Sequence, residues 1–147
     1  MTRLIPPIYL AVAVFLMVVL HQFTPGPRIV PMGLGWISLF CWGVALTVGI
    51  SAEWQFWKRG ASVLPLRTPP HLVREGVYRF SRNPMYVSLI LICAGVAVQL
   101  GTTTPWIAVV LFALWLDRVF VRREEDLLQA HFGETYREYC NRVRRWL

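Results

Sequence analysis

The sequence predicts an all-α integral membrane protein with four transmembrane helices, a cytoplasmic loop and an amphipathic C-terminal helix. Hydrophobic residues make up 56% of its 147 residues and charged residues only 16%, and the mean hydropathy is +0.49. A soluble domain of this length has too small an interior for so much apolar surface, so lipid must solvate part of it. The basic residues behind the net charge of +7 lie between and after the apolar stretches. This distribution favours loops at an anionic membrane surface over the binding of nucleic acid.

The first predicted span is residues 4–23, which contain no Asp, Glu, Lys or Arg. A helix of this length extends about 30 Å, the thickness of a bilayer core. Pro6 and Pro7 fall in its first turn, where a missing N–H is tolerated, and Thr-Pro-Gly-Pro at 24–27 ends it. Because no small-residue cleavage pattern follows the apolar core, we expect a retained helix rather than a signal peptide.

The second predicted span is residues 32–57, and a polar loop at 58–83 follows it. The span is rich in glycine, which lets membrane helices approach closely, either in a dimer or within one chain. Pro65, Pro69 and Pro70 preclude a regular helix in the first half of the loop. A loop of this length inside a compact protein is usually functional.

The third and fourth predicted spans are residues 84–100, which begin with a proline, and 106–121. A tail helix at 122–145 follows, and apolar residues recur along it at steps of three or four. These residues are Leu128, Phe132, Tyr136, Tyr139, Val143 and Trp146. The stripe that they form must either pack on the polar loop or lie on the membrane surface.

The distribution of basic residues predicts the orientation of the chain. Residues 58–83 contain six Lys or Arg residues and residues 118–145 contain seven, whereas the turn at 101–105 contains none. With four spans, this places both termini and the polar loop on the cytoplasmic side of a cell inner membrane. We expect residues 1–147 to form a single multi-pass domain.

Two polar segments therefore lie on one side of the membrane, where they can close over one site. The first, at 71–86, reads HLVREGVYRFSRNPMY, and the second, at 122–139, contains a Glu-Glu pair and then FGETYREY. Both resemble the isoprenylcysteine carboxyl methyltransferase family, which belongs to a broader group with the phospholipid N-methyltransferases. The family's loop reads Leu-Val-x-x-Gly-x-Tyr and then Arg-His-Pro-x-Tyr, and its tail has Glu-Glu and then Phe-Gly-x-x-Tyr-x-x-Tyr. The resemblance covers roughly residues 65–147.

The resemblance implies that S-adenosyl-L-methionine binds between the loop and the tail helix. The residues that it assigns to the cofactor are His71, Leu72, Val73, Gly76, Tyr78, Asn83, Pro84, Met85, Tyr86 and Glu124. A carboxylate suits the cofactor's ammonium, an arginine or backbone N–H suits its carboxylate, and aromatic faces suit its sulfonium. We assign Arg82, Tyr86 and Arg123 to catalysis. No Cys or His spacing typical of a metal site appears in the sequence, so we expect no metal.

The chain departs from the family pattern at two positions. Asn83 stands where the family has histidine, and an amide cannot act as a base at neutral pH. Phe120 stands where the family has an arginine close to the substrate carboxylate. Three nearby arginines are alternative replacements: Arg118, Arg122 and Arg123.

The two adjacent glutamates cannot both face one small ligand, because neighbouring helical residues point about 100° apart. The resemblance assigns Glu124 to the cofactor, so we expect Glu125 to form a structural pair with Arg122 or with an arginine of the loop.

Carboxyl O-methylation of an isoprenylcysteine-like acceptor fits a site without a histidine, because a carboxylate is already nucleophilic at neutral pH. The acceptor, a lipophilic small molecule or a lipidated substrate, would enter laterally from the membrane lipids. Phospholipid N-methylation, thiol S-methylation and a non-enzymatic four-helix membrane protein remain alternatives. Membrane reductases that use NADPH are longer, with more spans. The sequence leaves the oligomeric state open.

Overall fold

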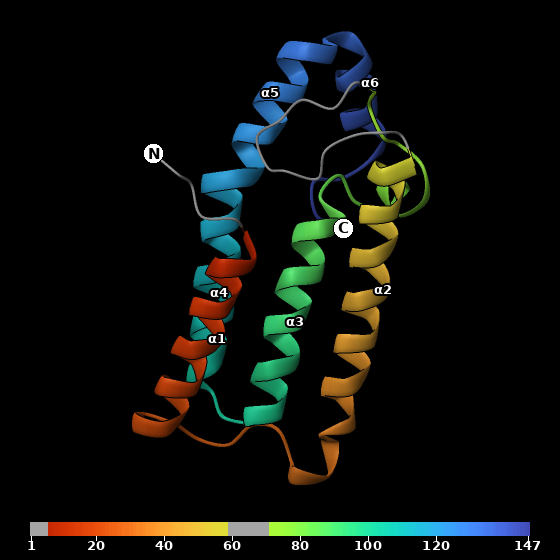
Figure 1. The fold of residues 1–147 in the computed structure, drawn as a ribbon. Coiled ribbons are helices and arrows are strands. Elements are labelled where there is room, and N and C mark those ends of the chain that lie inside the picture. Colours follow the sequence, from red (N-terminus) through yellow and green to blue (C-terminus); the bar gives the residue numbers. More distant parts are fainter. Residues whose placement is uncertain (1–5, 59–70) are drawn as a thin grey trace.

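The computed structural model describes residues 6–58 and 71–147, which form a bundle of helices topped by a smaller polar layer (Figure 1). The helices are α1 (Pro6–Phe23), α2 (Trp36–Lys58), α3 (Pro84–Leu100), α4 (Thr104–Leu116), α5 (Arg122–Phe132) and α6 (Glu134–Arg142). Two 3-10 turns, η1 (Met32–Leu34) and η2 (Gly76–Arg79), and a π-helical turn, η3 (Asp117–Val121), complete the elements. The predicted all-α fold is confirmed for the described residues.

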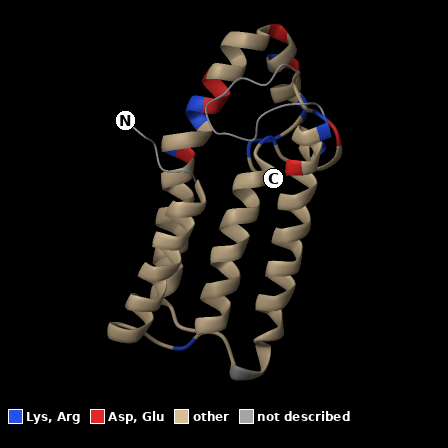
Figure 2. Cartoon of the chain, viewed as in Figure 1, with Lys and Arg blue, Asp and Glu red and all other residues tan. Residues whose placement is uncertain are grey.

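Among the described residues, three helices are long and apolar enough to cross a membrane: α1, α2 and the continuous helix Thr104–Phe132, which comprises α4, η3 and α5. The other predicted span, α3, is an apolar helix of 17 residues. Charged residues gather at the end of the bundle that carries the loop and the tail (Figure 2). The bundle therefore has the layered polarity of a multi-pass membrane protein.

The observed boundaries follow the predicted ones closely in the spans. Helix α3 has the predicted bounds, and α2 starts at Trp36 rather than at residue 32, because a 3-10 turn precedes it. The first residues of the predicted N-terminal span and positions 59–70 of the predicted loop lie outside the described residues. The helix containing Asp117 and Arg118 continues into the polar layer, as predicted.

The prediction of one uninterrupted tail helix over 122–145 is wrong. The helix breaks at Gly133, which has φ +53° and ψ −124°, and α6 ends at Arg142. Glycine tolerates this conformation because it has no Cβ. The break turns α6 back so that Tyr136, Tyr139 and Val143 form one buried cluster with Leu72 of the loop. The apolar stripe therefore packs on the loop, one of the two possibilities left open by the sequence.

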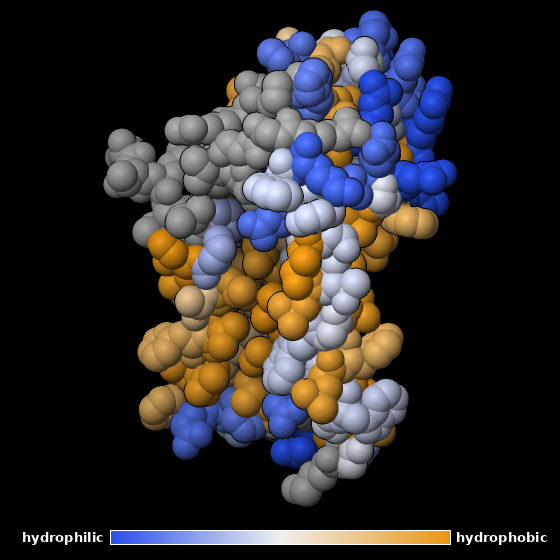
Figure 3. All heavy atoms as spheres, turned by 45° about the vertical axis from the view of Figure 1, so that its right-hand side comes forward, coloured by the Kyte–Doolittle hydropathy of each residue, from blue (hydrophilic) through white to orange (hydrophobic). Residues whose placement is uncertain are grey.

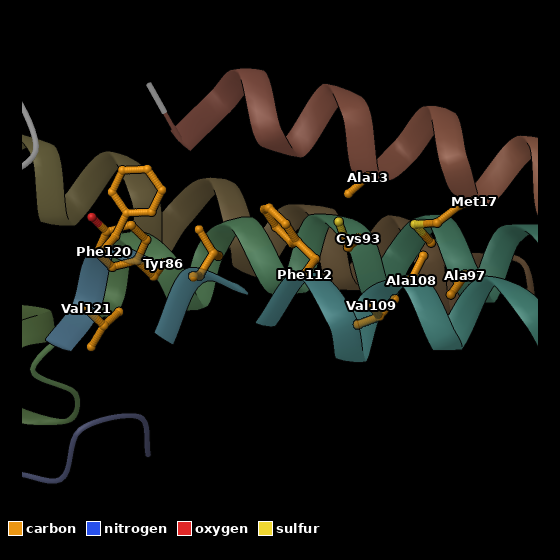
Figure 4. Packing of buried hydrophobic residues seen from close by; sticks show 11 residues of the cluster. Ala13, Met17, Tyr86, Cys93, Ala97, Ala108, Val109, Phe112, Phe120 and Val121 are labelled. Carbon is orange, nitrogen blue, oxygen red and sulfur yellow. The ribbon is translucent and has the colours of Figure 1, made fainter. Parts of the chain in front are cut away.

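The core of the bundle lies between α1, α3 and α4 (Figure 4). Small side chains line the contact, with Ala13, Ala97 and Ala108 all buried, and Met17 fills the space between them at 0% exposure. Small residues permit the close approach through which membrane helices gain van der Waals contact. The packing fixes the start of α3 beside the end of α4, where the polar site begins.

Candidate functional site

A pocket opens between the end of α2, the loop, the start of α3 and the tail helices. Its cavity volume is about 80 Å³, or about 540 Å³ when the gaps between atoms and the open solvent at its mouth are counted as well. The sequence-predicted residues that line it are Leu72, Val73, Tyr78, Arg82, Asn83, Pro84, Met85, Tyr86 and Glu124. The two segments, which residues 87–121 separate in the chain, thus meet at one pocket, as predicted from the sequence.

Three of the predicted site residues do not line the pocket. His71 and Arg123 are exposed to solvent. Gly76 has φ +59°, and the amide of Gln55 occupies the place where a Cβ would stand. The glycine of the motif is therefore required by the backbone turn and by its close approach to α2.

Tyr86 and Glu124 connect the start of α3 to the start of α5. The Tyr86 hydroxyl donates a hydrogen bond of 2.8 Å to Glu124 Oε1. Tyr86 is 6% exposed and also belongs to the core of the bundle. This contact places a carboxylate, held by a rigid aromatic side chain, on the wall of the pocket.

Aromatic rings form another part of the pocket wall. Tyr78, in η2, lies with its ring centroid 5.7 Å from that of Phe56. The Tyr139 hydroxyl donates a 2.7 Å hydrogen bond to the backbone oxygen of Tyr78 and so ties α6 to the loop. Burial raises the pKa of the Tyr78 hydroxyl, and the negative charges of ionised Tyr139 and of Glu124 raise it further. Tyr78 therefore stays neutral at physiological pH.

Glu125 is the centre of a buried polar network behind the pocket. Its Oε2 accepts hydrogen bonds from Arg145 Nε and Nη2 at 2.9 and 2.7 Å. Its Oε1 lies 3.6 Å from Arg82 Nη2 and accepts a hydrogen bond of 3.3 Å from Asn83 Nδ2. The hydrogen bond with Glu125 raises the pKa of Arg145. The predicted pairing of Glu125 with a loop arginine is confirmed for Arg82.

Arg122, the other predicted partner of Glu125, instead forms an ion pair of 2.8 Å with Asp117. Arg145 also contacts this aspartate, at 3.5 Å. Sequence reasoning did not single out Arg145, because this contact depends on the reversal of the chain at Gly133 and carries no local signal.

Asn83 bridges the loop and the C-terminal strap (residues 143–147). Besides Glu125, its amide nitrogen donates to the backbone oxygen of Arg145 at 3.1 Å. Ser81 donates to the same oxygen at 3.3 Å, and the Arg82 backbone N–H donates to Arg144 O at 3.0 Å. The amide donors of Asn83 are thus engaged in holding the strap, where the related family has a histidine.

Four further residues line the pocket that sequence reasoning did not assign to a site: Phe56, Leu128, Tyr136 and Tyr139. Both tyrosines belong to the Phe-Gly-x-x-Tyr-x-x-Tyr motif, so the motif itself was the available signal. Within the described parts of the chain, no three His, Cys, Asp or Glu side chains come together in a way that suits a metal ion.

The helical bundle, with three helices among the described residues that are long and apolar enough to cross a membrane, has the features of a multi-pass membrane protein with a pocket at one end. Residues 34–135 match the phospholipid methyltransferase family, and the chain belongs to this family. An uncharacterized protein of Haemophilus influenzae is 41% identical over 63 residues, which cover 43% of this chain and the whole of that protein.

Two isoprenylcysteine methyltransferases are more distant homologues. Protein-S-isoprenylcysteine O-methyltransferase of Schizosaccharomyces pombe is 33% identical over 75 residues, 49% of this chain and 30% of that protein. Protein-S-isoprenylcysteine O-methyltransferase B of Arabidopsis thaliana is 36% identical over 86 residues, 55% of this chain and 42% of that protein. The matched region is therefore less than half of each enzyme. No solved structure matches the chain.

Proposed function

We propose that the chain binds S-adenosylmethionine in the pocket and catalyses methyl transfer to a lipophilic acceptor in the membrane. The observation that carries this proposal is the position of Glu124, hydrogen-bonded to Tyr86 on one wall and facing a pocket lined by Tyr78, Tyr139 and Arg82. These side chains suit the charges of the cofactor. Membership in a methyltransferase family supports the same proposed activity.

The donor set fits an amino-acid zwitterion that carries a sulfonium. Glu124 would hold the ammonium group, and Arg82 would hold the carboxylate. The Nε of Arg82 is buried and makes no hydrogen bond to another residue that the structure describes. The tyrosine rings would face the sulfonium, which aromatic faces attract as they do other cations.

The bound cofactor would supply an electrophilic methyl group, and the protein would supply alignment. In this displacement the acceptor forms its bond to the methyl carbon as the sulfur–carbon bond breaks, and the electron pair stays on sulfur. The pocket tyrosines and the start of α3 would exclude water and hold the reacting centres in line, which would lower the entropic part of the barrier.

A carboxylate is the acceptor that these residues favour. No histidine lines the pocket among the described residues, and the amide donors of Asn83 are engaged by Glu125 and Arg145. An amine acceptor would first have to lose a proton, whereas a carboxylate is already nucleophilic. We therefore favour carboxyl O-methylation of an isoprenylcysteine-like substrate. Phospholipid N-methylation is the second candidate, because the matching family is that of the phospholipid methyltransferases.

We further propose that α3 crosses the membrane with the three longer spans. Its 17 residues extend about 25 Å, close to the lower limit for a span. Both termini and the pocket would then face the cytoplasm, from which the cofactor would enter.

Isothermal titration of the purified protein with S-adenosylhomocysteine tests the cofactor site. We expect binding by wild type that weakens at least tenfold in Glu124→Ala, since a hydrogen bond to a charged group contributes about 1.5–3 kcal/mol. Glu138→Ala, which removes an exposed carboxylate of α6, is the matched control and should bind like wild type. Absence of binding by folded wild type would contradict the proposal.

The acceptor class is tested by transfer of a radiolabelled methyl group to a prenylated cysteine, a phosphatidylethanolamine or an alkyl thiol. A methyl ester releases volatile methanol in base, whereas N-methyl and S-methyl products do not. Base-labile product from the prenylated cysteine is expected. Labelled phospholipid instead would establish the second candidate.

A further inference from the structure

A second hollow lies on the outer side of α2, where this helix meets the turn η2. Helix α2 contributes Ile50, Trp54 and Gln55 to its lining, and the loop contributes Val77, Arg79 and Phe80. We call this hollow the interfacial groove. It shares no lining residue with the pocket described above.

The interfacial groove combines exposed apolar side chains with an exposed cation. Phe80 is 75% exposed, Ile50 64% and Trp54 51%. Arg79 is exposed as well, and no carboxylate lines the groove among the described residues. Arg79 likewise forms no ion pair with any residue in the described ranges 6–58 and 71–147. The groove thus joins a hydrophobic wall to a positive charge at its rim.

The depth of the groove in the membrane follows from the position of α2. This helix is long and apolar enough to cross a bilayer, and its last turns carry Trp54, Trp57 and Lys58. The two indoles stack at 5.0 Å, and Lys58 Nζ lies 5.4 Å from the Trp54 ring centre. Tryptophan and lysine are typical of the level at which hydrocarbon gives way to head groups. Figure 3 shows hydrophobic side chains over the bundle and hydrophilic ones gathered above them on this side of the molecule.

The turn η2 presents its residues to two different sites. Gly76 lies against α2, with Gln55 in the space that a Cβ would take. From this turn Tyr78 faces the pocket at 6% exposure, while the next two residues, Arg79 and Phe80, are exposed. An occupant of the interfacial groove would therefore contact the outer side of the element that carries a wall of the pocket.

We propose that the interfacial groove binds a glycerophospholipid of the surrounding leaflet. The phosphate binds Arg79, and an acyl chain lies along Ile50 and Phe80. Charge complementarity, the exposed apolar wall and its continuity with a membrane-spanning helix support this occupant. The inference does not depend on the proposed methyl transfer, because the two sites have no lining residue in common.

Native mass spectrometry of the detergent-purified full chain with added phosphatidylglycerol tests the groove. We expect wild type to retain one lipid, and Arg79→Ala to lower the retained fraction about fivefold, the effect of one basic residue at an anionic surface. Phe80→Ala should also lower it, by removing the apolar wall. Matched controls are Arg142→Ala, an exposed arginine of α6, and Phe15→Ala, a 70% exposed phenylalanine of α1.

Each alternative outcome overturns the proposal. Equal retention by all variants would mean that the lipid binds elsewhere, and loss of the lipid in the controls as well would mean nonspecific adhesion. Displacement by excess inorganic phosphate would make the groove a phosphate site rather than a lipid site. Because both groove residues are exposed, we expect unchanged thermal midpoints in all variants. If Arg79→Ala lowers the thermal midpoint, the charge is tested with Arg79→Lys instead. This variant keeps the positive charge and must retain the lipid.

Discussion

The membrane bundle and the polar layer above it are held together in different ways. Between α1, α3 and α4, Met17 and small residues such as Ala97 pack through van der Waals contact. In the polar layer, Glu125, Arg145 and Tyr139 make directed hydrogen bonds across segments far apart in the chain. Packing tolerates many combinations of apolar residues, whereas a buried charge tolerates few partners. The bundle therefore supplies a scaffold, and the geometry of the pocket depends on a few polar side chains.

The largest expected effect is that of Glu125→Ala, which breaks the polar layer. Removal of one member of a buried charge network costs about 3–5 kcal/mol, because partners such as Arg82, whose side chain is 14% exposed, stay largely buried without it. We expect a lower free energy of unfolding, measured in detergent, and loss of S-adenosylhomocysteine binding. Glu134→Ala is the control, because its 2.8 Å pair with Arg137 is exposed and contributes about 0–1 kcal/mol. Equal effects of the two variants would contradict the distinction between the regions.

Met17→Ala probes the bundle in the same assay. Its side chain is fully buried between helices, so the cavity left behind should cost about 2–5 kcal/mol. Affinity for S-adenosylhomocysteine should stay within twofold of wild type once the protein is folded. A large change in affinity without a loss of stability would show that the two regions are coupled more tightly than their contacts indicate.

Gly76→Ala distinguishes a backbone role of this glycine from contact with a ligand. A non-glycine residue at a positive φ costs about 1–3 kcal/mol, and the new Cβ would also displace Gln55. We expect reduced stability, read from the thermal midpoint. Gly43→Ala is the control, since nothing lies within 4 Å of its added Cβ, and it should be neutral or stabilising. Unchanged stability together with lost affinity for S-adenosylhomocysteine would instead indicate that Gly76 contacts the ligand.

Alkaline pH should weaken the polar layer through its buried tyrosines. Burial raises the pKa of both Tyr78 and Tyr139 above the ordinary value of about 10. A raised folded-state pKa contributes stability that is fully present below pH about 10 and is lost as the pH rises toward the folded value. Tyr139→Phe should therefore be less stable by about 1 kcal/mol at neutral pH, for the lost hydrogen bond to Tyr78, but should lose less stability above pH 10.

Unfolding free energies of wild type and Tyr139→Phe between neutral pH and pH about 11 check this prediction. Parallel curves for the two proteins would contradict the prediction, because they would mean that the pKa of Tyr139 is the same in the folded and unfolded states.

Local features of the sequence predicted much of the site. The resemblance to a known family gave the order of the two motifs and assigned Glu124 rather than Glu125 to the ligand, and Glu124 does line the pocket. The bounds of α3 follow from hydropathy and from the proline at its start. The interruption of the tail at Gly133 was missed, because the apolar stripe keeps its period across the glycine. The partner of Glu125 was only partly predicted, since Arg145 reaches it after that turn.

The sequence by itself determined that this protein is a helical membrane protein with its polar motifs on one end, because span length and hydropathy are local properties. Tertiary structure decided which faces pack, since helices that are apolar all round carry no periodic signal for a partner. It also decided that Asn83 and Glu125 secure the strap while Tyr86 and Glu124 face the pocket. These roles depend on which way side chains point after the chain reverses at Gly133. The local sequence does not specify how side chains from distant segments are oriented relative to one another.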